Sequence, residues 1–145
     1  MKRHSVLIVD DNAIDLMVHS RALKRSGRFD TVDTAQSGKE ALALLQDHAA
    51  NRLQDPEQFP VLLMLLDINM PVMNGFDFLE RLKEIGLTDD PRFIVMLTSS
   101  SADTDRQKAL SNARVADYLV KPFSTTDAHA IADKLDSWED SPPGS

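Results

Sequence analysis

Three carboxylates, one hydroxyl and one ammonium each directly follow a short apolar run in this sequence: Asp10 and Asp11, Asp67, Thr98 and Lys121. Carboxylates brought close together repel one another, so one of them must bind a proton or a cation must join them. Oxygen ligands with room for water suit Mg²⁺. A carboxylate beside such an ion can attack phosphorus and form an aspartyl phosphate. Lys121 and Mg²⁺ would then neutralise phosphoryl oxygens, and the Thr98 hydroxyl would donate a hydrogen bond to another.

The apolar runs that precede these side chains are expected to be strands. Runs this short and apolar on both faces are typical of buried parallel strands. Strong runs cover residues 6–9, 61–66 and 93–97, and weaker ones cover residues 29–35 and 116–120. Between the runs, helical periodicity predicts helices that begin at Asn12 and Ser37, and further helices over residues 76–86, 101–113 and 126–138.

Some of these helices carry start and stop signals. Asn12 is a favoured N-cap, and Gly27 is placed to end the same helix. Ser37 followed by Glu40 has the pattern of a capping box. The apolar residues expected on one face of the first helix are Ile14, Met17, Val18 and Leu23. In the last helix, Ile131, Leu135 and Trp138 are expected to face inward.

The alternation of strands and helices predicts an α/β fold. Its sheet should be parallel and five-stranded, a (βα)5 arrangement with right-handed crossovers and helices on both faces. In such a sheet the carboxyl ends of the strands lie on one edge, where ligands bind. We therefore expect the five polar side chains to converge. One domain is expected over residues 1–138, with a long connection over residues 46–60 and a disordered, acidic tail over residues 139–145.

Composition excludes several classes of function. The chain of 145 residues has no cysteine, so disulfides, thiolate metal sites and cysteine nucleophiles are absent. A net charge of −7 argues against a broad basic face for nucleic acid. Neither a signal peptide nor a membrane span is apparent, which favours a cytoplasmic protein that does not bind membranes. The histidines have no ligand spacing and are expected at the surface: His4, His19, His48 and His129.

Taken in order, the motifs resemble those of the CheY-like receiver domains of two-component response regulators. They comprise Asp10-Asp11, the segment DINMPVMNG from Asp67 to Gly75, Leu97-Thr98-Ser99, and the segment YLVKP from Tyr118 to Pro122. The resemblance covers residues 6–138. It implies the doubly wound, flavodoxin-like sheet of strand order 2-1-3-4-5.

The resemblance also implies a role for each matching position. Asp67 matches the phosphoacceptor and is also expected to be a metal ligand. Asp11 and Asp10 match further metal ligands, and Asp10 would act mainly through water. Asn69 matches the residue whose backbone carbonyl completes the Mg²⁺ site.

Further positions match residues that bind the phosphoryl group or change position when it is present. Thr98 and Lys121 match the hydroxyl and the lysine that bind it, and Tyr118 matches the aromatic side chain that turns inward on activation. The Lys121–Pro122 peptide bond is expected to be cis because of the resemblance alone.

The partners implied by the resemblance are proteins. A sensor histidine kinase would donate the phosphoryl group to a stand-alone receiver, which would act as a switch and catalyse only its own phosphorylation and dephosphorylation. A downstream protein would bind the face formed by the fourth helix, the fifth strand and the fifth helix. The receiver would be a monomer or a phosphorylation-dependent homodimer. The long segment 46–60 is similar to that of phytochrome-associated single-domain regulators.

Three alternative functions remain open from the sequence. A Mg²⁺-dependent phosphatase or phosphotransferase with an aspartate nucleophile would use Asp-x-Asp, but Asn69 stands at the second position and cannot transfer protons. A flavin-binding protein of the same architecture would need a phosphate loop after the first strand, where Asp10 and Asp11 would repel phosphate. A silent interaction module would keep the fold without being phosphorylated.

Overall fold

The computed structural model describes residues 4–54, 63–68, 70, 73–85, 93–98, 103–111 and 115–140. Five strands alternate with five helices. In chain order they are β1 (His4–Val9), α1 (Ala13–Ser26), β2 (Phe29–Ala35), α2 (Gly38–Gln54), β3 (Leu63–Asp67), α3 (Gly75–Ile85), β4 (Phe93–Thr98), α4 (Asp103–Leu110), β5 (Val115–Val120) and α5 (Thr125–Asp140).

The strands form one parallel sheet in the order β2-β1-β3-β4-β5. Both the α/β class and this strand order are confirmed. The central strand β3 is buried along its whole length, as expected for a strand covered on both faces by helices.

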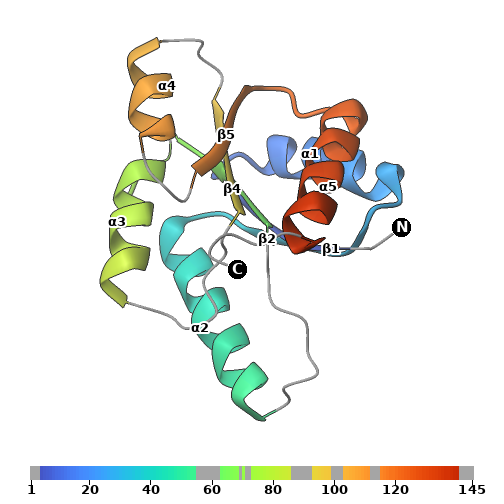
Figure 1. Cartoon of the computed structure of the whole chain (residues 1–145). Helices are drawn as coiled ribbons and strands as arrows, with labels where there is room; N and C mark the ends of the chain where they lie inside the picture. Colours follow the sequence, from blue (N-terminus) through green and yellow to red (C-terminus); the bar gives the residue numbers. More distant parts are fainter. Residues whose placement is uncertain are drawn as a thin grey trace.

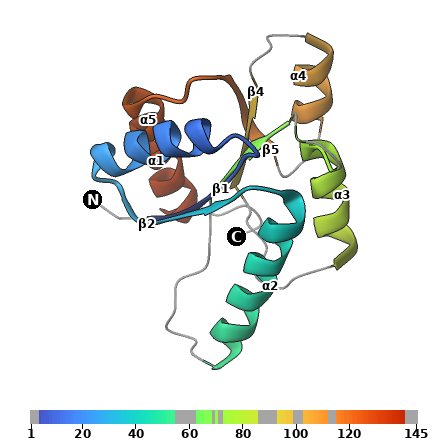
Figure 2. The ribbon, with the colours of Figure 1, turned by 180° about the vertical axis from the view of Figure 1, so that it is seen from behind.

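Helices cover the two faces of the sheet in unequal numbers. Helices α1 and α5 lie on one face, and α2, α3 and α4 lie on the other (Figures 1 and 2). Alternate residues of each inner strand serve opposite layers: Val6 and Ile8 of β1 pack beneath α1 and α5, whereas Leu7 and Val9 pack beneath α2 and α3.

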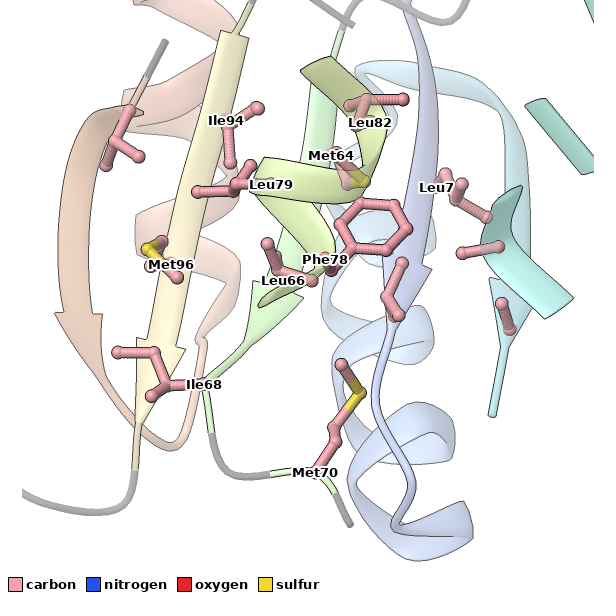
Figure 3. Packing of buried hydrophobic residues seen from close by; sticks show 14 of the residues in the cluster. Leu7, Met64, Leu66, Ile68, Met70, Phe78, Leu79, Leu82, Ile94 and Met96 are labelled. Atoms are coloured by element: carbon pink, nitrogen blue, oxygen red, sulfur yellow. The ribbon is translucent and has the colours of Figure 1, made fainter. Parts of the chain in front are cut away.

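Phe78 of α3 is the largest fully buried side chain in the layer that α2, α3 and α4 cover. Figure 3 shows its ring facing Met64 of β3 and Leu7 of β1. Neighbouring Leu79 and Leu82 complete the buried face of α3. Burying side chains of this size contributes about 1.5–3 kcal/mol each relative to exposure. This packing holds α3 against β3, the strand that ends in Asp67.

The predicted helix caps are present. The side chain of Asn12 accepts hydrogen bonds from the backbone N–H of Ile14 (2.9 Å) and Asp15 (3.1 Å). Gly27 ends α1 with a φ of 71°, a left-handed conformation that favours glycine. At α2, the hydroxyl of Ser37 accepts from the N–H of Glu40, whose own carboxylate accepts from Gln36 rather than from Ser37.

The predicted apolar face of α1 is wrong for three of its four residues. Leu23 is buried, but Ile14, Met17 and Val18 are 66%, 48% and 41% exposed. The buried face runs instead along Leu16, His19, Ala22, Leu23 and Ser26. This face packs against α5. It includes the polar residues His19 and Ser26, so a prediction based on apolar periodicity does not find it.

The prediction that His19 lies at the surface is also wrong, because its side chain is only 1% exposed. Its ring meets the ring of Phe123 edge to face, with centroids 6.3 Å apart. His129 is exposed as expected. The side chains of His4 and His48 lie outside the described part of the chain.

Two element ends also differ from expectation. Helix α2 continues to Gln54, so much of the predicted connection over residues 46–60 is helical. Helix α5 continues to Asp140, two residues into the predicted tail, and residues 141–145 lie outside the described ranges. The inward packing of Ile131 and Leu135 is confirmed, while the side chain of Trp138 is not among those described. No helix in the described part of the chain is both long and apolar enough to cross a membrane.

Candidate functional site

Four strand ends bring the polar side chains to one edge of the sheet. Asp10 follows β1, Asp67 ends β3, Thr98 ends β4 and Lys121 follows β5. Backbone hydrogen bonds continue the sheet into this edge. The N–H of Asp10 donates to the carbonyl of Ala35 (3.0 Å), and that of Lys121 donates to the carbonyl of Thr98 (2.7 Å). The predicted convergence therefore rests on extended backbone and not on flexible loops.

Asp10, Asp11 and Asp67 form an acidic cluster. One carboxylate oxygen from each lies within 4.8 Å of the others. Asp10 and Asp67 are 1% and 4% exposed, and Asp11 is exposed. Buried carboxylates are costly unless a cation or hydrogen bonds offset their charge. The cluster therefore has two shielded carboxylates and one that opens to solvent.

The donor set of this cluster fits a divalent cation. All three ligands are carboxylate oxygens, which hard cations such as Mg²⁺ prefer. The three carboxylate oxygens lie close enough together that they could bind one such ion directly or through water. The exposed Asp11 leaves an approach for water ligands and for a further anionic ligand.

Lys121 is the cation that the structure places beside this cluster. Its Nζ lies 2.8 Å from Oδ2 of Asp10, 2.8 Å from Oδ2 of Asp15 and 3.4 Å from Oδ1 of Asp67. Burial by itself lowers the pKa of Lys121, but the hydrogen bonds to Asp10 and Asp15 and the charges of Asp67 and Asp10 raise the pKa above its ordinary value overall. Lys121 is therefore a permanent ammonium at this site.

Asp15 is a site residue that the sequence reasoning missed. It lies in the first turn of α1, and its side chain is 33% exposed. The available signal was its spacing: the predicted N-cap at Asn12 places Asp15 on the first helical turn, next to the end of β1. An acidic residue in a first helical turn is so often explained by the helix dipole that it gave no reason to expect a contact with Lys121.

The remaining predicted residues are placed as follows. Thr98 is fully buried at the end of β4. Tyr118 is 7% exposed and packs in the layer covered by α2, α3 and α4. The Lys121–Pro122 peptide bond is cis, as the resemblance implied. Asn69 lies outside the described residues, so its predicted carbonyl ligand is an untested expectation.

Gly75 holds the segment after Asp67 close to α3. Its N–H donates to the carbonyl of Ile68 (2.9 Å). A Cβ at this position would lie 2.8 Å from the backbone oxygen of Asp67 and 3.0 Å from Cα of Ile68. Real Cβ atoms do not approach backbone atoms so closely, so only glycine allows α3 to begin here.

Comparisons with known proteins agree with this geometry. The family described as "Response regulator receiver domain" matches residues 6–133 of the chain. The chain is 34% identical over 131 residues to the two-component response regulator ORR3 of Oryza sativa subsp. indica, covering 90% of this chain and 88% of that protein.

Two solved structures share the fold. A two-component response regulator from Cytophaga hutchinsonii superposes with a TM-score of 0.80 at 25% identity, covering 94% of this chain and 99% of the other. The bacteriophytochrome response regulator AtBRR superposes with a TM-score of 0.67 at 27% identity, covering 92% of each chain. The second likeness agrees with the expected similarity to phytochrome-associated regulators.

Proposed function

The chain belongs to the response regulator receiver domain family, and on that premise we propose that Asp67 accepts a phosphoryl group from a sensor histidine kinase. The observation that carries the proposal is the acidic cluster of Asp10, Asp11 and Asp67 with Lys121 beside it. A nucleophilic carboxylate, oxygen ligands for a cation and a permanent ammonium are the groups that phosphoryl transfer to aspartate needs.

In this proposal each residue has a distinct task. The carboxylate of Asp67 attacks phosphorus, while the bond from phosphorus to the donor nitrogen breaks and its electron pair leaves with the donor imidazole. Asp10 and Asp11 would hold Mg²⁺, with the carbonyl of Asn69 as a further ligand. A bound Mg²⁺ would supply charge neutralisation for the phosphoryl oxygens. Lys121 and Thr98 would bind two phosphoryl oxygens from the side of β4 and β5.

The output surface that we propose is the face formed by α4, β5 and α5. Leu110 of α4 and Val120 of β5 are 45% and 46% exposed. Apolar side chains exposed on neighbouring elements are a common basis for protein contact. Tyr118 belongs to β5, one of the elements of this face, and lies three residues before Lys121, so a shift in its population between two positions could couple the face to the site. We further propose that the protein acts as a stand-alone receiver through contact with a downstream protein.

The competing enzyme function is the Mg²⁺-dependent phosphatase. Among the described residues, the acidic cluster contains Asp10, Asp11 and Asp67, and position 69 is Asn. No acid stands two residues after Asp67 to protonate a leaving group in repeated turnover. We therefore expect a single phosphorylation event followed by slow hydrolysis.

Incubation with acetyl phosphate tests the proposal. The wild-type protein should gain one phosphoryl group, seen by intact mass, with Mg²⁺ present and not with a chelator. Release of phosphate that continues for many turnovers with a phosphomonoester would instead favour the phosphatase. A wild-type protein that never gains mass under these conditions would contradict the receiver function.

A further inference from the structure

The ammonium of Lys121 has three N–H donors, and two of them are already committed. Asp10 and Asp15 each accept a hydrogen bond from Nζ at 2.8 Å, and Asp67 lies at 3.4 Å. The positive charge is therefore shared among three carboxylates before any phosphoryl group arrives. The proposed function needs this same charge for a phosphoryl oxygen.

Asp15 differs from the other two partners of Lys121. Asp10 and Asp67 belong to the acidic cluster that could hold a metal ion, whereas Asp15 is not in that cluster. Asp15 comes from the first turn of α1, where its backbone N–H is fixed by the side chain of Asn12. Its carboxylate therefore acts on the site through Lys121 and through its charge.

We propose that Asp15 is a positioning residue that limits how strongly Lys121 binds the phosphoryl group on Asp67. The inference rests on the proposed function and adds a regulating residue to it. The carboxylate of Asp15 occupies one N–H of Lys121 and offsets part of its charge. It also repels the phosphoryl oxygens directly. Both effects weaken the phosphorylated state relative to a site in which position 15 is neutral.

The same charge has the opposite effect on a cation. A negative Asp15 attracts Mg²⁺ toward the cluster and offsets the repulsion between Mg²⁺ and Lys121. Neutralising Asp15 should therefore weaken Mg²⁺ binding while it strengthens phosphoryl binding. Because a partly solvated site screens charges strongly, each affinity should change only about three- to tenfold. Salt should reduce both changes.

The variant that tests this is Asp15→Asn, which keeps a hydrogen-bond acceptor of the same size but removes the charge. Asp15→Glu keeps the charge and should behave as the wild type. Asp33→Asn is the matched control, because Asp33 is an exposed carboxylate on β2 outside the acidic cluster. It removes one negative charge from the chain without touching the site. Thermal unfolding of every variant should remain cooperative.

Two calorimetric titrations give the readout. The first measures the affinity of the apo protein for Mg²⁺, and the second measures the affinity for beryllium fluoride, a phosphoryl analogue, at saturating Mg²⁺. Asp15→Asn should bind Mg²⁺ more weakly and beryllium fluoride more tightly, while Asp33→Asn changes neither. A merely structural role would weaken both affinities.

The outcomes separate the inference from the proposed function. If the wild type binds beryllium fluoride but Asp15→Asn has unchanged affinities, or loses both, the role of Asp15 is wrong and the receiver function stands. If the wild type binds no beryllium fluoride and gains no phosphoryl group, both are wrong.

Discussion

The Nζ atom of Lys121 lies 3.4 Å from Oδ1 of Asp67, so the proposed phosphoacceptor already faces the cation proposed to bind its phosphoryl group. The two residues come from the ends of β3 and β5, with β4 between them in the sheet. In the metal-free protein this contact also stabilises the fold, because Lys121 offsets the charges of the buried carboxylates.

Removing the ammonium of Lys121 should destabilise the metal-free protein. Lys121→Gln leaves the carboxylates of Asp10 and Asp67 buried without a positive partner, and we expect the free energy of unfolding to fall by about 3 kcal/mol. Saturating Mg²⁺ should recover part of this loss, since a bound cation stabilises the folded state that binds it. Urea unfolding with a chelator and with Mg²⁺ measures both effects.

The matched control is Lys134→Gln, which breaks an exposed pair with Asp117. Exposed pairs contribute about 0–1 kcal/mol, so this variant should lose little stability. Mg²⁺ should stabilise it by the same amount as it stabilises the wild type. Equal losses in the two lysine variants would contradict a special role for Lys121.

His19 should make the protein less stable in acid. Burial lowers the pKa of His19, opposed by the charges of Asp15 and Asp10 and assisted by that of Lys121. In the folded protein His19 binds a proton only at a pH below its ordinary pKa. In the unfolded chain it binds a proton near that ordinary pKa of 6.5. Stability is full above that pH and falls as the pH drops below it, by at most about 1.4 kcal/mol per pH unit from this one group.

His19→Leu tests this dependence, because leucine keeps apolar packing against Phe123 and cannot titrate. Chemical unfolding between pH 5 and pH 8 should show a smaller slope for this variant than for the wild type, by up to one proton. His129→Gln, at an exposed position, should keep the wild-type slope. A slope unchanged in His19→Leu would rule out this titration.

Arg28, in the connection between α1 and β2, should act as a clamp onto the second half of α5. Its buried guanidinium donates to Asp133 (2.9 Å) and Asp136 (2.8 Å). Arg28→Met should lower the free energy of unfolding by about 2 kcal/mol, since hydrogen bonds to charged groups contribute about 1.5–3 kcal/mol each. The buried Nε of Arg28 has no hydrogen-bond partner, and removing it offsets part of the loss.

For comparison, Arg81→Met removes an arginine whose pair with Glu84 is exposed, and it should cost less than about 1 kcal/mol. Thermal or urea unfolding of the two variants side by side decides the matter. If Arg81→Met costs as much as Arg28→Met, the clamp is not specific to Arg28.

Gly75 should be intolerant of a side chain. The added Cβ of Gly75→Ala meets backbone atoms of Asp67 and Ile68, which cannot move without shifting the proposed phosphoacceptor. We expect a loss of about 1–3 kcal/mol and slower phosphorylation. In Gly38→Ala the nearest atom is Sδ of Met73, in a flexible side chain and not in the backbone, so that variant should cost less. Urea unfolding and the rate of mass gain with acetyl phosphate report the two effects.

Much of the fold followed from pattern alone. Short apolar runs located β1, β3 and β4 because these strands are buried on both faces. The edge strands β2 and β5 gave only weaker runs, because they also carry exposed residues. Polar residues at the strand ends located the site because parallel strands end on one edge. Caps at Asn12 and Ser37 located the starts of α1 and α2 through purely local hydrogen bonds.

The errors arose where distant contacts decide the outcome. On α1, Ile14, Met17 and Val18 are more apolar than His19, yet α5 and Phe123 cover the His19 face. Helix α2 continues through a polar stretch whose composition carries no strong periodic signal. Asp15 belongs to the site only through its contact with Lys121. The two residues are far apart in sequence, and the sheet topology places them side by side.

The central claim is that the phosphoryl group attaches to Asp67, and chemical mapping tests this most directly. After phosphorylation by acetyl phosphate with Mg²⁺, borohydride reduces an aspartyl phosphate to homoserine, which peptide mass spectrometry can locate. We predict homoserine at position 67 in the wild type, at the same position in Asp33→Asn, and nowhere in Asp67→Asn. Homoserine at another aspartate of the wild type, or a modification that persists in Asp67→Asn, would contradict the account.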